Sequence, residues 1–190
     1  MCGRYYIAIE DDELQDIMRE VQQKVDAVKL AAVKTGEIFP TNIVPILTPN
    51  GAALMKWGFS RFDGKGQIIN ARSETLLEKP MFKKPLLDGQ RCLVPASNYF
   101  EWQAQPAGKK IKHTIYNPSE PVIYMQGLYR TEKESDLPAF VVLTKEADSN
   151  LRIIHERMPV ILDSVNAKSW LIGDSYQFHV NGSKLVYKIS

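Results

Sequence analysis

Turn signals divide almost the whole chain into short runs of residues that favour β-strands. The dipeptide Asn50-Gly51 is a strong hairpin signal between residues 44–48 and 53–59, so we predict that these two runs pair. Further strands are predicted at 5–9, 91–95, 99–102, 112–116, 122–129, 139–144, the later part of 155–162, and 184–189. Strands this short and this numerous favour a mainly antiparallel, barrel-like sheet.

Helical periodicity is limited to a few segments between these strands. A helix is predicted to begin at Asp11 or Asp12, because apolar residues then recur at spacings of three, four and seven. These residues are Leu14, Ile17, Met18, Val21, Val25 and Val28. Shorter helices are predicted within 79–87, at 148–154 and at 163–171. Since the sequence has neither a repeat nor a linker, we predict one α+β domain over residues 1–190, with helices flanking the sheet.

Composition narrows the class of protein without identifying a function. The 190 residues are 44% hydrophobic and 24% charged, and we expect neither a signal peptide nor a membrane span. Cys2 and Cys92 are the two cysteines, and no Cys/His group has metal-ligand spacing, so we expect no cofactor and a reducing, cytoplasmic setting. A net charge of +2 is compatible with a nucleic-acid partner but does not require one.

The chain begins Met1-Cys2-Gly3-Arg4, which places a reactive group at the start if Met1 is removed. Cys2 would then carry a free amine and a thiol on adjacent carbons. An α-amino group is roughly 10–15% neutral at pH 7, a few-hundred-fold more than a lysine. Such an amine can add to an aldehyde, and the thiol can then close a thiazolidine ring. The alternative is an ordinary buried cysteine.

Glu101 and His155 are candidates for moving protons. Strand alternation sends Phe100 and Trp102 to one face and Tyr99 and Glu101 to the other. A carboxyl group held against aromatic rings has a raised pKa and becomes a usable acid, whereas an exposed Glu on a wet face does not. His155 lies at a predicted helix-to-strand junction, where a histidine is either functional or a structural hydrogen-bonding residue.

Several other residues could contact a nucleic acid. Arg4 lies beside the reactive terminus, and a guanidinium group binds phosphate through two parallel hydrogen bonds. Asn70 and Arg72 could orient a sugar and a phosphate, or could simply fix a turn. Trp57 and Trp102 could stack on unpaired bases, although burial is the commoner fate of tryptophan.

Five ordered motifs together are more specific than any one of these residues. They are Met1-Cys2-Gly3-Arg4, Trp57-Gly58-Phe59, residues 69–75 (INARSET), residues 91–96 (RCLVPA) with Phe100-Glu101-Trp102, and residues 154–162 (IHERMPVIL). In this order and spacing the chain resembles the SRAP family, the SOS-response-associated peptidase or abasic-site-processing proteins. The resemblance covers nearly the whole chain.

The resemblance implies a DNA-protection enzyme without a cofactor. Its partner would be single-stranded DNA with an abasic site, whose ring-opened aldehyde crosslinks to Cys2, and proteins of the replication fork could be further partners. By the same resemblance, Asn70 orients the terminus and the sugar, and Glu101 and His155 move protons. Arg4 and Arg72 would contact phosphates, and Pro40, in an approximate match to the family's Asn-Ala-Pro segment, would line the DNA groove. We expect a monomer that works in the cytoplasm, on the nucleoid if the source is bacterial.

Three other functions use the same residues. A hydrolase with an N-terminal nucleophile, such as a glutamine-dependent amidotransferase domain, also begins Cys-Gly after Met removal. Such domains need an Asn-Gly loop, for which Asn50-Gly51 and Asn181-Gly182 are available, and an Arg-Gly-Pro-Asp-like segment, which is absent. A thiol peptidase would pair Cys2 with His155. A binding module would keep all of its activity in a Cys2→Ala variant.

Overall fold

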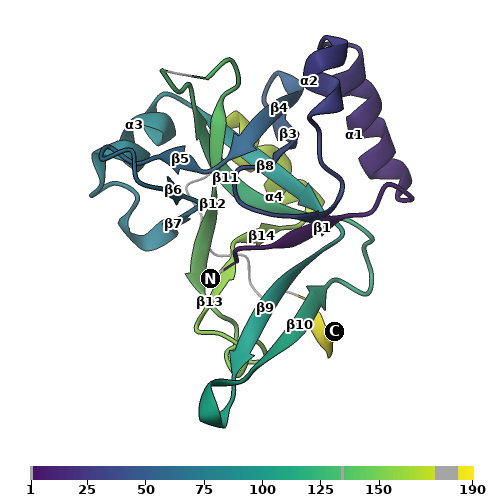
Figure 1. Cartoon of the computed structure of the whole chain (residues 1–190), viewed down its shortest axis with the longest axis vertical. Coiled ribbons are helices and arrows are strands. Elements are labelled where there is room, and N and C mark those ends of the chain that lie inside the picture. Colours follow the sequence, from purple (N-terminus) through teal and green to yellow (C-terminus); the bar gives the residue numbers. More distant parts are fainter. Residues whose placement is uncertain (1, 134, 174–183) are drawn as a thin grey trace.

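The computed structural model describes residues 2–133, 135–173 and 184–190, so Met1, His179 and Asn181-Gly182 lie outside the described residues. Two β-sheets and a separate two-stranded pair make up its framework, and helices flank them. In Figure 1 the helices α1 (Asp12–Gln22) and α2 (Ala27–Ala31) lie at the upper end of the view. A hairpin of β9 (Asn98–Ala104) and β10 (Lys110–Tyr116) extends at the lower end.

The larger sheet closes on itself. Its path runs through β12 (Ala139–Glu146), β4 (Gly51–Trp57), β3 (Ile43–Thr48), β8 (Arg91–Ala96) and β11 (Ile123–Arg130), and β11 also pairs with β12. The neighbouring pairs of this ring are antiparallel except β12 with β4. The short strands β13 (Arg157–Pro159), β14 (Ile161–Leu162) and β7 (Asn70–Arg72) join its edges, β7 in parallel with β12. The predicted barrel-like, mainly antiparallel sheet is confirmed.

The second sheet carries the start of the chain. Its strand order is β15 (Val186–Ile189), β10, β9, β1 (Tyr5–Ile7) and β2 (Gly36–Ile38), and all of the pairings are antiparallel. Tyr5 pairs with Ile38 on one side and with Tyr99 on the other. The N-terminal segment is therefore held between β2 and β9. The remaining strands, β5 (Phe59–Ser60) and β6 (Gln67–Ile68), pair only with each other in the described chain.

The hairpin signal at Asn50-Gly51 is confirmed, since β3 and β4 pair with Thr48 opposite Gly51. Gly51 has a φ of 93°, a conformation that glycine adopts without strain. The helix predicted within 79–87 forms as α3 (Pro80–Leu87), and Asp163 caps α4 (Ser164–Ile172) by accepting a 2.8 Å hydrogen bond from the Asn166 N–H. Two 3₁₀ turns, Ser73–Thr75 and Pro106–Gly108, complete the described helices.

Two helix predictions were wrong in part. The first helix ends at Gln22, because the Asp26 side chain accepts the Lys29 N–H and begins α2, and Val28 is left 82% exposed. Leu14, Ile17 and Val21 are buried as predicted. Residues 148–154 form successive turns rather than a helix. Their ends are drawn together by the Ala147 N–H donating to the Glu156 carbonyl at 2.8 Å, next to the β12–β13 hairpin.

The core contains the largest buried side chains of both sheets. Trp57 stacks on Phe140 at a centroid distance of 6.3 Å and contacts Tyr5 at 5.1 Å. Cys2 belongs to the same cluster and is fully buried. Among the described helices, none has the length and apolar character needed to cross a bilayer. The architecture is α+β, and its core reaches directly to the second residue of the chain.

Candidate active site at the N-terminal cysteine

Asn70 and Cys2 meet although they are 68 positions apart. The Asn70 Nδ2 donates a 2.8 Å hydrogen bond to the carbonyl oxygen of Cys2. Asn70 begins β7, which the parallel pairing with β12 fixes opposite Val142. The Asn70 Oδ1 is buried and has no hydrogen-bond partner among the described residues. One side of this amide therefore holds the Cys2 backbone, and the other side presents an acceptor that no described residue uses.

Glu101 is the buried acid of this site. It lies on β9 with 4% exposure, and burial raises the pKa of its carboxyl group above the ordinary value. Burial, and then the charge of Glu101, raise the pKa of the Cys2 thiol well above its usual range. Burial and the same two groups also raise the pKa of Tyr99. Cys2, Glu101 and Tyr99 therefore share one poorly solvated region where charge is disfavoured.

His155 lies in the loop that faces this side of β9. The Gln103 Nε2 donates a 3.1 Å hydrogen bond to the Ile153 carbonyl, and Gln103 follows Glu101 by two residues on the same face. The His155 Nδ1 accepts a 2.9 Å hydrogen bond from the Arg157 N–H, which leaves Nε2 as the proton-carrying nitrogen of the neutral ring. Burial lowers the pKa of His155, so the neutral form prevails near neutral pH.

Arg157 fixes the His155 loop to the ring of strands. Its NH1 and NH2 groups donate to both carboxylate oxygens of Glu74 at 2.7 and 2.8 Å, and NH2 also donates to the Thr144 carbonyl at 2.6 Å. A planar guanidinium matched to a carboxylate in this way fixes both partners. Glu74 and Arg157 belong to two of the ordered motifs, but we predicted no role for either residue. The order of motifs in a sequence does not reveal that Glu74 and Arg157 meet.

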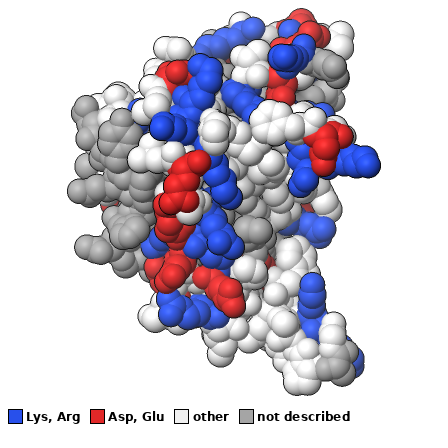
Figure 2. Space-filling model, turned by 90° about the vertical axis from the view of Figure 1, so that its left-hand side faces the viewer, with Lys and Arg blue, Asp and Glu red and all other residues white. Residues whose placement is uncertain are grey.

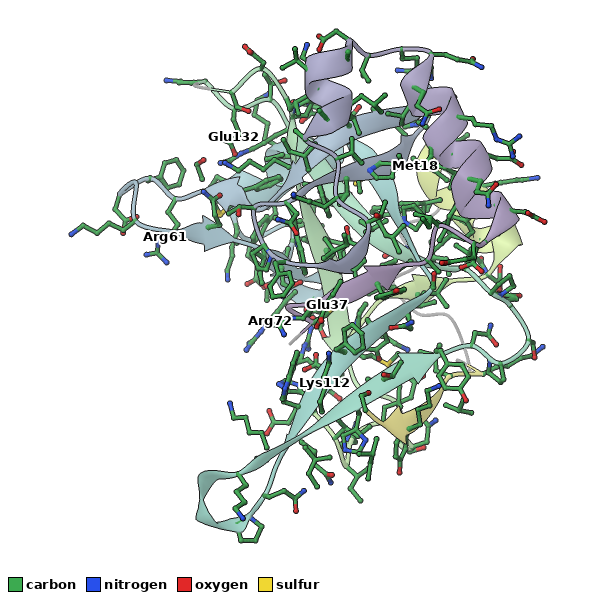
Figure 3. All side chains as sticks on the ribbon, turned by 45° about the vertical axis from the view of Figure 1, so that its right-hand side comes forward. Met18, Glu37, Arg61, Arg72, Lys112 and Glu132 are labelled. Atoms are coloured by element: carbon green, nitrogen blue, oxygen red, sulfur yellow. The ribbon has the colours of Figure 1, made fainter. Side chains whose placement is uncertain are left out.

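A second group of residues lies on the opposite face of β9. Arg4 and Lys112 are held there by Glu37, whose Oε1 accepts from Arg4 at 3.2 Å and from Lys112 at 2.9 Å. Figure 3 shows Glu37 and Lys112 on this part of the molecule. On the face shown in Figure 2, basic and acidic side chains are interspersed instead of forming a continuous basic surface. Sequence reasoning missed Glu37 and Lys112, for which no motif gave a signal.

The predicted nucleic-acid contacts differ in accessibility. Trp57 is 0% exposed and donates its indole N–H to the Ile69 carbonyl at 3.0 Å, so the prediction that it stacks on bases was wrong. A tryptophan that fills the core between Tyr5 and Phe140 cannot also face a ligand. Arg72 is exposed, and Trp102 and Pro40 are half-buried, so these three side chains can be reached from solvent.

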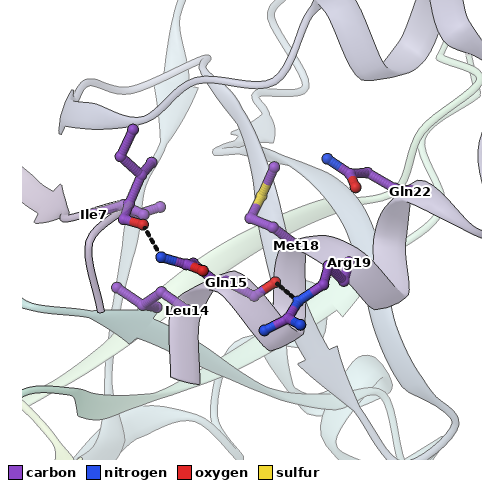
Figure 4. Close-up of a pocket in the computed structure, with 7 residues that line it drawn as sticks. Ile7, Leu14, Gln15, Met18, Arg19 and Gln22 are labelled. Atoms are coloured by element: carbon purple, nitrogen blue, oxygen red, sulfur yellow. Dashed lines mark hydrogen bonds between the residues drawn. The ribbon is translucent and has the colours of Figure 1, made fainter. Parts of the chain in front are cut away.

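Two cavities among the described residues have linings that do not include Cys2. One, of about 360 Å³, lies between β1 and α1, with Gln15 donating to the Ile9 carbonyl at 2.9 Å beside it (Figure 4). It is lined by Ile7, Ile9, Leu14, Gln15, Met18, Arg19 and Gln22. A second, also of about 360 Å³, lies beside α3. Among the described residues no three His, Cys, Asp or Glu side chains gather as a metal site would require.

The fold and the site define an α+β protein with a buried cysteine near its N-terminus, held by an amide beside a buried acid. The family model described as SOS response associated peptidase (SRAP) matches residues 1–185, and the chain belongs to this family. Abasic site processing protein YoqW of Bacillus subtilis (strain 168) is 33% identical over 189 residues, which cover 90% of this chain and 80% of that relative.

One further relative and one solved structure also match most of the chain. Abasic site processing protein YobE of the same strain is 32% identical over 189 residues, which cover 90% of this chain and 82% of the relative. A crystal structure of a protein from Bacteroides thetaiotaomicron matches with a TM-score of 0.78 at 23% identity, covering 99% of this chain and 91% of that chain. At that identity the likeness establishes the fold alone.

Proposed function

We propose that this protein captures abasic sites in single-stranded DNA by a covalent bond to Cys2. The observation that carries the proposal is the hydrogen bond from Asn70 to Cys2 beside the buried acid Glu101, in a family whose relatives are named abasic site processing proteins. Removal of Met1 makes Cys2 the terminus and frees its amine. The protein then reacts with an aldehyde at a position that the fold has already fixed.

The proposed reaction has two bond-forming steps. The neutral amine of Cys2 adds to the aldehyde carbon of the ring-opened sugar and gives a carbinolamine, which loses water to form an imine. The Cys2 sulfur then bonds to the imine carbon and its proton passes to the nitrogen, closing a thiazolidine ring. The product contains the protein and the DNA minus one water. Because the ring no longer holds an imine, it resists the β-elimination that would break the strand.

Asn70 positions the amine in this scheme. Its Nδ2 already holds the Cys2 carbonyl, and its buried Oδ1 has no partner among the described residues. A buried amide oxygen without a partner is costly, and the free amine of Cys2 is a donor of the right kind. Binding through both ends of the Asn70 amide orients the nitrogen lone pair toward the aldehyde.

Glu101 supplies the proton for dehydration. Burial raises the pKa of its carboxyl group, so at a given pH more of it is protonated than in an exposed glutamate. The carbinolamine hydroxyl needs such an acid in order to leave as water. The buried surroundings also favour the uncharged thiol over a thiolate.

His155 transfers the proton when the sugar ring opens. Opening the sugar ring moves a proton between the ring oxygen and the hydroxyl group, and a neutral imidazole can accept and donate it. The Nδ1 of His155 is engaged by Arg157, so Nε2 is the nitrogen that reaches a ligand. By microscopic reversibility the same group assists when the crosslink reopens.

Arg72 and the half-buried Trp102 are the proposed contacts to neighbouring nucleotides. A single strand fits the proposal better than a duplex, because a partner strand would cover the aldehyde. A thiol peptidase is less well supported, since thiol catalysis requires a thiolate, and burial and Glu101 both raise the pKa of the Cys2 thiol.

The direct test is a denaturing gel of the protein mixed with a single-stranded oligonucleotide that carries one abasic site. We expect a heat-stable adduct with the processed wild type and none with Cys2→Ala or with a form that retains Met1. Cys92→Ala is the matched control, because Cys92 is equally buried and has no proposed role. A stable adduct in Cys2→Ala would overturn the assignment.

A further inference from the structure

Glu37 bridges two cations with a single oxygen atom. Its Oε1 accepts from the Arg4 NH1 at 3.2 Å and from the Lys112 Nζ at 2.9 Å. The three residues come from different parts of one sheet, with Arg4 just before β1, Glu37 on β2 and Lys112 on β10. The side chains of Arg4 and Glu37 are each 32% exposed and that of Lys112 is 27% exposed, so the bridge borders solvent.

Aromatic rings hold both cations in place independently of Glu37. The Arg4 guanidinium lies 4.2 Å from the centre of the Phe39 ring and 4.9 Å from that of Trp102. The Lys112 ammonium lies 3.8 Å from the centre of the Phe100 ring and 5.8 Å from that of Trp102. Contacts of this kind orient a cation without neutralising its charge. The two cations therefore remain together if the carboxylate moves away.

The carboxylate is ionised and can move. Burial alone would raise the pKa of Glu37, but the hydrogen bonds and charges of Lys112 and Arg4 outweigh it, and the pKa lies below its ordinary value. Glu37 belongs to β2, a three-residue strand at the edge of its sheet. Rotation of its side chain toward solvent needs no change in the strand pairing.

We propose that Arg4 and Lys112 form a binding site for one phosphate of single-stranded DNA, which Glu37 occupies until the DNA displaces it. The inference rests on the proposed function, because that function brings a DNA strand to Cys2, two residues from Arg4. A phosphate oxygen takes the place of Oε1 and accepts from the same two donors. The site is preorganised, so the two side chains lose little freedom when DNA binds.

Glu37 thereby sets how strongly the protein holds DNA without a covalent bond. While the carboxylate is in place, the three side chains present a net charge of +1 instead of +2. A strand that binds must displace an anion already bound to both cations. Undamaged strands therefore dissociate readily, and strands with an abasic site are retained by the bond to Cys2.

The test measures binding of a single-stranded oligonucleotide without an abasic site, by fluorescence anisotropy at several salt concentrations. We expect Glu37→Gln to bind about threefold to tenfold more tightly than wild type, because the carboxylate no longer competes. The slope of log K against log salt should also become steeper, because the three side chains then present a net charge of +2 instead of +1 to the strand. Unchanged or weaker binding by Glu37→Gln would overturn the proposal.

Glu132→Gln is the matched control. Glu132 accepts from Arg130 at 2.9 Å, and that guanidinium also lies over an aromatic ring, 4.3 Å from the centre of Phe59. Glu132 lies away from Glu37 and Lys112 in Figure 3. Each substitution removes one negative charge beside a ring-stacked cation. An equal gain in binding from Glu132→Gln would mean that the effect comes from the overall charge of the protein, and it would overturn the proposed phosphate site.

The double variant Glu37→Gln/Lys112→Ala isolates the site. It should lose the gain in affinity and the added salt slope, whereas retention of both would contradict the role of Lys112. Since the oligonucleotide carries no aldehyde, this experiment does not depend on the crosslink. If the wild type forms no adduct with abasic DNA but Glu37→Gln still binds undamaged strands more tightly, the phosphate site is supported and the proposed function is wrong.

Discussion

The Asn70 side chain donates a 2.8 Å hydrogen bond to the Cys2 carbonyl, and so ties the start of the chain to β7 in the ring of strands. The contact fixes the backbone next to the atoms that would react. An amine attached to a free terminus would sample many orientations, whereas this one is confined. Much of the rate advantage of the proposed reaction comes from that confinement.

Asn70→Asp should slow crosslinking by roughly 10- to 100-fold, because a carboxylate cannot donate to the Cys2 carbonyl and the terminus shifts. The measurement is the initial rate of adduct formation on abasic single-stranded DNA. Asn150→Asp is the control, since Asn150 donates in the same way to the Leu185 carbonyl at 2.9 Å, outside the site. Similar rates for Asn70→Asp and wild type would show that Asn70 does not orient the terminus.

Glu101→Gln should slow crosslinking by about 10²- to 10⁴-fold, because it keeps the shape of the side chain and removes the acidic proton. In wild type the rate should rise with pH as the amine loses its proton. It should fall again as pH rises through the raised pKa of Glu101, because the acid is then lost. In a plot of crosslinking rate against pH, the variant should keep the rise and lose the fall. A falling limb of unchanged position in Glu101→Gln would assign that titration to another group, such as Tyr99 or His155.

His155→Ala should mainly slow opening of the sugar and reversal of the crosslink. Release is measured by moving a purified adduct into an excess of competing abasic DNA and following free protein with time. We expect slower release by about 10²-fold or more with capture of a pre-opened aldehyde little changed. If His155→Ala matched wild type in both rates, its proposed role would be wrong.

Glu74→Gln should destabilise the fold and loosen the His155 loop, because Arg157 loses its bidentate partner. The hydrogen bonds from Arg157 lower the pKa of Glu74 to about 2, below the value of about 4.3 expected when unfolded. The carboxylate therefore stabilises the fold above pH ~4.3, and this contribution is lost as pH falls toward 2. Since the Glu74 side chain is 40% exposed, we expect a loss of about 1 kcal/mol at pH 7.

Urea unfolding of wild type and Glu74→Gln near pH 7 and near pH 3 measures this difference, which should shrink at the lower pH. Asp88→Asn is the control, because its partner Lys84 is 78% exposed and the pair should contribute little. An equal loss of stability at both pH values would mean that the charge of Glu74 is not its source.

Local signals predicted the local structure well. The turn at Asn50-Gly51 determines the pairing of β3 with β4, and the alternation along β9 correctly sends Glu101 away from the face that holds Phe100 and Trp102. Both features depend on neighbours in sequence. The turns at 148–154 were mistaken for a helix because the contacts that close that loop come from Glu156 and Met158, beyond the capping residues.

The site depends on distant contacts, which sequence patterns do not encode. The residues around Asn70 do not by themselves show that its amide meets Cys2, and it was the family resemblance that implied that Asn70 orients the terminus. The residues around Glu74 likewise do not indicate a contact with Arg157. A tryptophan suits both a core and a DNA-binding surface, so residue type alone does not tell which of the two Trp57 occupies. Its packing against Tyr5 and Phe140 places it in the core. The bridge of Glu37 to Arg4 and Lys112 joins strands that are separated by much of the chain.

Intact mass spectrometry of the product with abasic single-stranded DNA tests the central claim most directly. The account predicts one adduct whose mass is that of the chain without Met1 plus the DNA, minus one water. Borohydride should leave this mass unchanged, because a thiazolidine has no imine to reduce, whereas Cys2→Ser should give an adduct only when borohydride is present. A wild-type adduct that retains Met1, or one that gains two hydrogens on reduction, would contradict ring closure through the amine and thiol of Cys2.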